Sequence, residues 1–270
     1  MNQENLETLD WEHLSGHYDA KRRLEVAASG NHSILLVGPP NSGKTKLARS
    51  LVTILPEKPF IAPHPRTDSL SDAIKQAHGG ILFLEAFEQW DTPSRTLLGE
   101  TVGQQPSQFL LIATTVYCPC GNFADERAEC NCSMVSVEAY QKPLYETIDA
   151  CFAIEVQIPS VNHIAPRRRD EPSQVVRKRV EAAHMIQHQR NGTDRLNSAL
   201  SRSEVELDPL AQKLLVAAQK RLHPSPMSEL FVLQVARTSA DLAISYSPSV
   251  ESTHMAEAIC YRHRWKAVEQ

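Results

Sequence analysis

The chain has 270 residues, of which 41% are hydrophobic and 22% are charged, so it can bury a substantial core as one large domain or two smaller ones. Its formal net charge of −4 argues against a uniformly basic nucleic-acid binder. No run approaches the roughly 20 apolar residues that cross a bilayer, and the acidic first residues do not resemble a signal peptide. We therefore expect a cytoplasmic protein with no membrane partner.

The first part of the chain is predicted to form an α/β fold. Residues 44–51, which follow the first apolar run and a turn rich in Gly and Pro, have helical spacing. The segments between later apolar runs are long enough for crossover helices, so we expect a parallel sheet with helices on both faces, ending near Pro159. The runs that predict buried or half-buried strands are residues 33–37, 81–84, 109–113 and 152–156.

The second part of the chain is predicted to be helical. Residues 160–171 are rich in proline, arginine and polar side chains, which suits a linker. After them, apolar residues recur at intervals of three and four, with Ser and Pro between the periodic segments. The expected helices lie at about residues 172–189, 209–221, 227–246 and 250–266.

A phosphate-binding motif follows the first predicted strand. Residues 38–45 match the pattern G-x-x-x-x-G-K-[ST] between a strand and a helix, where consecutive backbone N–H groups and the helix N-terminus favour a polyphosphate. Lys44 would reach the β- and γ-phosphates of a nucleoside triphosphate, and Thr45 would place its hydroxyl on Mg²⁺. The residues expected to bind the nucleotide are Gly38, Pro39, Pro40, Asn41, Ser42, Gly43, Lys44 and Thr45.

The strand predicted at residues 81–84 supplies an acidic residue. It ends in Glu85-Ala86, which gives one carboxylate where a nucleotide hydrolase usually has two, one for Mg²⁺ and one to polarise the attacking water. We assign Glu85 as the candidate Mg²⁺ ligand and catalytic residue. Glu88 is predicted to be a solvated charge one turn into a helix; the alternative is that it substitutes for the second carboxylate.

Four of the six cysteines cluster in a C-x-C…C-x-C arrangement, at Cys118, Cys120, Cys130 and Cys132. Four thiolates can satisfy tetrahedral Zn²⁺, and a short loop with few apolar residues would gain order from the metal. The C-x-C spacing is tighter than the usual C-x₂-C, so zinc binding and four free thiols both stay open.

Several motifs in the same order resemble the magnesium-chelatase-like AAA+ ATPases, specifically their ComM/YifB branch. The resemblance covers nearly the whole chain. We expect the chain to lack the N-terminal Lon-protease-like domain of full-length relatives. The segments that carry the resemblance are residues 20–27, 38–45, 62–64, 77–84, 118–121, 176–180, 195–197 and 235–242.

The resemblance implies an AAA+ module, in which residues 1–160 form an αβα nucleotide-binding domain and residues 161–270 form a helical lid. Such modules bind ATP with Mg²⁺ and typically assemble as rings with ATP between subunits. A homo-oligomer, or a hetero-oligomer with an intact AAA+ relative, is therefore expected. The ComM-type relatives also imply DNA as a partner, and the chelatase relatives imply metal insertion into a porphyrin.

Four positions that support hydrolysis in the family differ here. Ala86 stands where the catalytic glutamate is expected, Val116 or Tyr117 where the sensor asparagine is expected, Thr147 at the arginine-finger position and Met227 near the second sensor arginine. Because each lost stabiliser of a transferring phosphoryl group slows turnover by orders of magnitude, we expect ATP binding with weak or absent hydrolysis. An active ATPase that remodels branched DNA or another macromolecule is the alternative.

The basic residues that follow the predicted sheet offer an alternative source for the arginine finger. Arg167, Arg168 and Arg169 form the basic run within the expected linker. We favour a solvated linker for these charges.

Overall fold

The computed structural model describes residues 9–104, 108–123, 125–160, 170–192, 195–243 and 247–262. Five parallel strands form one sheet in the order β2-β3-β4-β1-β5. They are β1 (Ile34–Val37), β2 (Phe60–Ile61), β3 (Ile81–Leu84), β4 (Leu110–Thr115) and β5 (Ile154–Gln157). The predicted parallel sheet is confirmed, with the two-residue β2 as an edge strand that the apolar pattern did not reveal.

Helices cover both faces of the sheet, as predicted. On one face α4, α5 and α6 pack in a row, and on the other α2 and α3 meet at the short helix η2. This division follows from the right-handed crossovers between parallel strands. The helices are α2 (Tyr18–Gly30), α3 (Lys44–Ser50), α4 (Leu70–Gln76), α5 (Thr92–Gln104) and α6 (Met134–Cys151), with the 3₁₀ helices η1 (Trp11–His13), η2 (Leu51–Thr53) and η3 (Phe87–Gln89).

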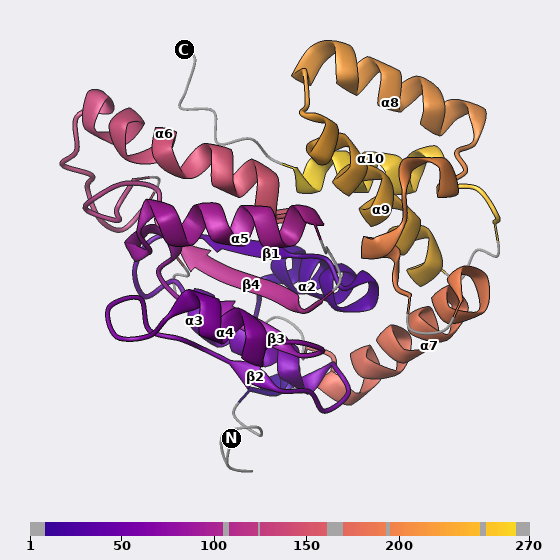
Figure 1. Cartoon of the computed structure of the whole chain (residues 1–270), viewed down its shortest axis with the longest axis horizontal. Helices are drawn as coiled ribbons and strands as arrows, with labels where there is room; N and C mark the ends of the chain where they lie inside the picture. The colour runs from indigo at the N-terminus through magenta and orange to yellow at the C-terminus, as the bar shows by residue number, and fades with distance from the viewer. Residues whose placement is uncertain are drawn as a thin grey trace.

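The C-terminal part is helical, and α7 to α10 lie together at the right of the sheet in Figure 1. Its helices begin at recognisable caps: the Asp208 carboxylate accepts from Ala211 N before α8, and the Ser225 hydroxyl accepts from Ser228 N before α9. A proline occupies the first position of both helices. The elements are α7 (Ser173–Asn191), η4 (Asn197–Ala199), η5 (Arg202–Glu204), α8 (Pro209–Leu222), α9 (Pro226–Leu242) and α10 (Ser252–Tyr261).

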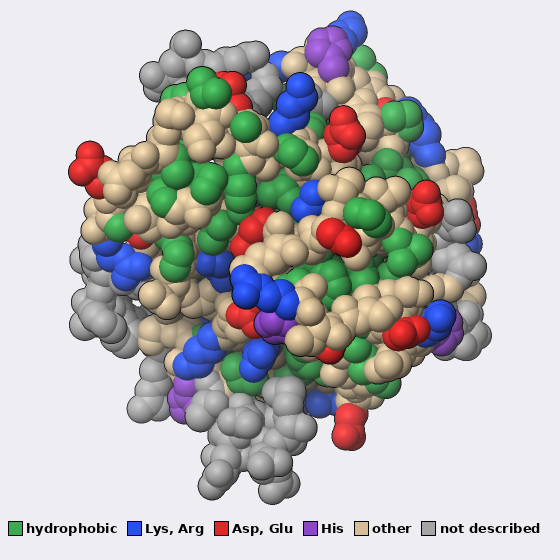
Figure 2. Space-filling view, turned by 60° about the vertical axis from the view of Figure 1, so that its left-hand side comes forward, with side chains coloured by type: hydrophobic (Ala, Val, Ile, Leu, Met, Phe, Trp, Pro, Cys, Tyr) green, Lys and Arg blue, Asp and Glu red, His purple; other side chains and the backbone are tan. Residues whose placement is uncertain are grey.

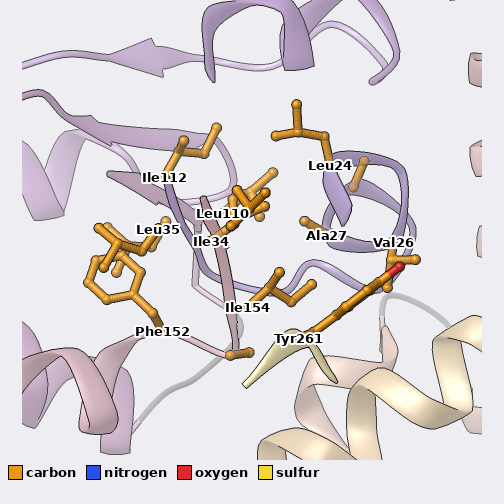
Figure 3. Close-up of a cluster of buried hydrophobic side chains, with 14 of the residues drawn as sticks. Leu24, Val26, Ala27, Ile34, Leu35, Leu110, Ile112, Phe152, Ile154 and Tyr261 are labelled. Atoms are coloured by element: carbon orange, nitrogen blue, oxygen red, sulfur yellow. The ribbon is translucent and has the colours of Figure 1, made fainter. Parts of the chain in front are cut away.

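The helical part packs directly against the sheet. Figure 3 shows Tyr261 of α10 beside Val26 of α2 and Ile154 of β5. Polar contacts join the two parts as well, because His32 after α2 hydrogen-bonds Thr238 of α9 at 2.7 Å. Buried hydrophobic residues from both parts form one cluster. The fold is therefore that of a P-loop AAA+ sandwich followed by a helical unit, and the division at residue 160 stays a prediction.

Several predicted boundaries were wrong. The helices expected to end at residues 246 and 266 end at Leu242 and Tyr261, where the next residue is no longer helical. The strand expected from residue 152 begins at Ile154, because Phe152 still donates its N–H to Ile148 and closes α6. The helix expected from residue 250 begins at Ser252, since Val250 forms a parallel β-bridge with Leu207.

The linker predicted at residues 160–171 is shorter at its C-terminal end. Asp170 is buried, and its carboxylate pairs with the buried Lys21 ammonium at 3.1 Å. Residues 161–169, which include the arginine run 167–169, lie outside the described residues. Among the residues that are described, no helix is long and apolar enough to cross a membrane.

Candidate functional site

The candidate phosphate loop (residues 38–45) leaves the carboxyl end of β1, at the point where the sheet's connections diverge. β4 lies on one side of β1 and β5 on the other, so the loop occupies the crevice at which open α/β sheets usually bind ligands. Asn41 and Gly43 adopt left-handed conformations, with φ of 61° and 92°, and α3 begins directly afterwards at Lys44. The predicted strand, loop and helix are thus all present.

The Lys44 ammonium lies within the loop itself. Its Nζ donates to the carbonyl oxygens of Gly38 at 2.7 Å and Pro39 at 2.6 Å. Partial burial lowers the pKa of Lys44, while the charges of Glu88 and Glu85 oppose that shift. The Lys44 ammonium is therefore hydrogen-bonded to two neutral carbonyl groups of the loop. The charged oxygens of a polyphosphate are stronger acceptors and could take their place.

The two predicted Mg²⁺ ligands lie in direct contact. Thr45 Oγ1 donates to Glu85 Oε1 at 2.7 Å, across the gap between α3 and the end of β3. Arg49 Nη2 lies 3.9 Å from the other Glu85 oxygen, so the exposed carboxylate faces one hydroxyl and one guanidinium. A hydroxyl and a carboxylate beside a phosphate site form the kind of oxygen pair that Mg²⁺ uses.

Glu88 does not behave as the predicted solvated surface charge. Ala86 takes a left-handed conformation with φ of 52°, which starts η3 at once and turns Glu88 back toward the sheet. Glu88 is half-buried, and its Oε2 accepts from Thr115 Oγ1 at 2.8 Å at the end of β4. Burial raises its pKa, whereas hydrogen bonds and the Lys44 charge oppose the rise. The site therefore contains a second carboxylate that motif reasoning placed elsewhere.

His17 also lies beside the loop and was missed by sequence reasoning. It precedes α2 in a left-handed conformation with φ of 53°. A Cβ built on Gly43 would lie 3.9 Å from the Nε2 atom of His17. Burial and the nearby Lys21 lower the pKa of His17, and Asp170 opposes them. Nothing in the local pattern marks this residue, whose neighbour Gly16 donates its N–H to the distant Asp170 at 3.3 Å.

The four clustered cysteines converge. Their sulfur atoms all lie within 4.8 Å of one another, and three of the pairs are separated by 3.4, 3.6 and 3.8 Å. A tetrahedral site with Zn–S bonds of about 2.3 Å has sulfur–sulfur edges of roughly 3.8 Å. Phe123 N also donates to Cys118 Sγ at 3.3 Å. The arrangement of the four sulfur atoms is compatible with Zn²⁺. The spacing of the cysteines in the sequence alone left this question open.

The other positions that differ from the hydrolytic pattern are spread over three parts of the fold. Tyr117 is buried after β4, and its carbonyl accepts from Gln141 Nε2 at 2.9 Å. Thr147 lies on α6, and Met227 is the second residue of α9. The structure thus brings together residues 38–45, Glu85 and, unexpectedly, Glu88.

Comparison with known proteins identifies the class. Residues 10–71 and 59–165 match the profile of magnesium chelatase, subunit ChlI, and residues 170–262 match the profile of the ChlI C-terminal region. The chain therefore belongs to the magnesium chelatase ChlI family.

Individual relatives place it within the ComM/YifB branch. It is 27% identical over 312 residues to the uncharacterized protein YifB of Salmonella typhimurium and 28% identical over 312 residues to the competence protein ComM of Haemophilus influenzae. Both matches cover 94% of this chain and 60% of the relative, so the chain spans about 60% of the length of these relatives. The resemblance seen in the motifs is confirmed.

Proposed function

We propose that this chain binds Mg-ATP at the candidate phosphate loop, as the nucleotide-binding part of an AAA+ module. The observation that carries the proposal is the 2.7 Å hydrogen bond between Thr45 and Glu85, which places a candidate Mg²⁺ pair next to Lys44 at the carboxyl ends of β1 and β3. In this proposal residues 1–160 form the nucleotide-binding domain and residues 161–270 the lid. Adenine as the base is inferred from the family, and ATP as the ligand favours a cytoplasmic location.

Within that proposal, nucleotide acts mainly as a bound ligand that controls assembly. Ala86 has no carboxylate to polarise water, and the arginine positions are occupied by Thr147 and Met227. Losing such groups slows phosphoryl transfer by several orders of magnitude, whereas phosphate binding depends on Lys44 and the loop backbone. The chain would then serve as a nucleotide-dependent subunit or regulator of a homo-oligomer or of an assembly with an intact AAA+ relative.

Sedimentation velocity with and without Mg-ATP tests the assembly role. We expect the mass of the wild-type particle to rise with nucleotide and the mass of Lys44→Ala to stay constant. A wild-type mass that is the same in both conditions, with nucleotide binding verified in parallel, rules the assembly role out.

Glu88 supports a second candidate function, an active ATPase that remodels branched DNA or another macromolecule. Its half-buried carboxylate lies among Thr115, Tyr140 and Lys44, near the place where a nucleophilic water would need a base. On the face shown in Figure 2, basic side chains are interspersed with acidic and hydrophobic ones. Phosphate release that rises several-fold with branched DNA would favour this candidate; release that ignores DNA would remove it.

We further propose that Cys118, Cys120, Cys130 and Cys132 bind one structural Zn²⁺. The support is the convergence of four sulfur atoms at near-tetrahedral spacing. Elemental analysis of purified protein should find one zinc per chain in the wild type and in Cys260→Ser, which replaces an exposed cysteine outside the cluster, and much less in Cys130→Ser. Wild-type protein without stoichiometric zinc refutes the site.

A further inference from the structure

The cysteine cluster lies against the candidate phosphate loop. Gly121, directly after Cys120, is buried with φ of 82°, and its N–H donates to Cys118 O at 2.9 Å. A Cβ built on Gly121 would lie only 2.9 Å from Cδ and Cγ of Pro40. The turn that carries two of the four sulfur atoms is therefore in van der Waals contact with the middle of the phosphate loop.

The segment that carries the cysteines, residues 117–133 and hereafter the cysteine loop, is buried mainly at its start, where Tyr117 and Cys118 are 9% and 0% exposed. Phe123 packs against Tyr117 with ring centroids 6.4 Å apart, and Arg127 donates to Ser160 Oγ at 2.7 Å beyond β5. Most of its remaining side chains are polar and partly or fully exposed. The polar, exposed part of the loop would gain order from four metal–sulfur bonds.

The phosphate loop depends on its neighbours in turn. Asn41 is a non-glycine residue in a left-handed conformation, which costs energy and persists only where the surrounding structure holds it. Pro40 precedes it, and the Gly121 backbone packs on the ring of this proline. Fixing the position of Gly121 therefore favours the loop conformation in which Asn41 is left-handed.

We infer that metal occupancy of the cysteine cluster raises the affinity of the phosphate loop for nucleotide, with Gly121 and Pro40 as the point of contact. This inference rests on the proposed binding of ATP and zinc. Because coupling between two binding sites is reciprocal, nucleotide must raise zinc affinity by the same factor. Coupling of this kind typically amounts to about 5–150-fold, and we expect about tenfold here.

The first experiment measures both directions of the coupling on the whole chain. A fluorescent ATP analogue is titrated in Mg²⁺ buffer against zinc-loaded protein, against protein stripped with a chelator and dialysed, and against stripped protein given zinc again. We expect about tenfold weaker binding after stripping and full recovery with zinc. Zinc transfer to a chromogenic chelator should in turn require about tenfold more chelator when nucleotide is bound.

The second experiment separates the contact from the metal. Gly121→Ala should retain zinc and bind the analogue several-fold more weakly, because its Cβ presses on Pro40. Gly79→Ala is the matched control: it has the same left-handed strain, with φ of 72°, but its Cβ meets nothing within 4 Å in the described part of the structure. Its nucleotide affinity should equal that of the wild type.

The outcomes are distinguishable. Equal nucleotide affinity of zinc-loaded and stripped protein, with circular dichroism unchanged, overturns the coupling and leaves the proposed ATP site intact. Failure of every form to bind nucleotide overturns the proposed function and the coupling with it. Zinc transfer that ignores nucleotide contradicts the coupling even if Gly121→Ala does not fold.

Discussion

Replacing Asp241 with asparagine should destabilise the helical part strongly. The Asp241 carboxylate is 1% exposed and accepts from Arg190 at 2.7 and 2.8 Å, from Arg237 at 3.0 and 3.2 Å, and from Asn197 at 2.8 Å. The amide keeps the shape of the side chain but leaves the Arg237 guanidinium, itself only 4% exposed, without its ion-pair partner, and the charge of Glu206 compensates only in part. Removing one partner of a buried ion pair costs about 3–5 kcal/mol.

The assay is thermal unfolding followed by circular dichroism at 222 nm and pH 7. A loss of that size lowers the Tm of a chain of this length by on the order of 10 °C. Glu181→Gln is the matched control, since the same acid-to-amide change breaks an exposed Arg177–Glu181 pair of 2.9 Å and should cost no more than about 0.5 kcal/mol. An Asp241→Asn protein that melts within about 2 °C of the wild type would refute the reasoning.

Three further predictions concern charge and metal. Glu88→Gln should lower the slow rate of phosphate release about a hundredfold, because a positioned general base contributes a rate factor of roughly 10²–10⁴. Nucleotide affinity should stay constant, and single-turnover hydrolysis measures both quantities. Thr45→Val should remove the gain in ATP affinity that Mg²⁺ confers, without changing Mg²⁺-free binding, as calorimetry with and without EDTA would show. Burial raises the pKa of Glu155 to about 7. The protonated side chain therefore contributes stability that is present below pH 4.5 and is lost as the pH rises through 7. Glu155→Gln should flatten this pH dependence and stabilise the protein at pH 8 by on the order of 3 kcal/mol.

Each of these has a control or a contrary result. Glu138→Gln, an exposed acid on α6, should hydrolyse ATP at the wild-type rate. Mg²⁺-free binding that also falls in Thr45→Val would mean that the hydroxyl shapes the loop rather than contacting the cation. Glu155 faces the charges of Arg262, Asp149 and Arg23, and a wild-type Tm that is constant from pH 5 to pH 8 would show that these charges already compensate its burial.

The parts of the fold that sequence could predict are those set by local pattern. The apolar run at β3 and the Gly-rich turn before α3 each specify a strand or a helix start within a few residues, and both were found where expected. The fold class also followed from the alternation of strands and crossover segments.

The parts that could not be predicted depend on backbone conformations and contacts distant in sequence. The left-handed turn at Ala86 redirects Glu88 into the site, and alanine gives no sign of such a turn. The packing of Gly121 on Pro40 joins residues 81 positions apart, and Asp170 pairs with Lys21 of α2. No periodicity or spacing encodes these approaches, because they arise only when the sheet is assembled.

Calorimetric titration of Mg-ATP into the wild type, Lys44→Ala and Lys46→Ala tests the central claim most directly. Lys46 is exposed on the same helix and serves as the matched control. We predict one site per chain in the wild type and in Lys46→Ala, and binding weaker by about tenfold to a hundredfold in Lys44→Ala, the range for loss of a charge-assisted hydrogen bond. Equal affinity for all three proteins, or no binding by the wild type, would contradict the account.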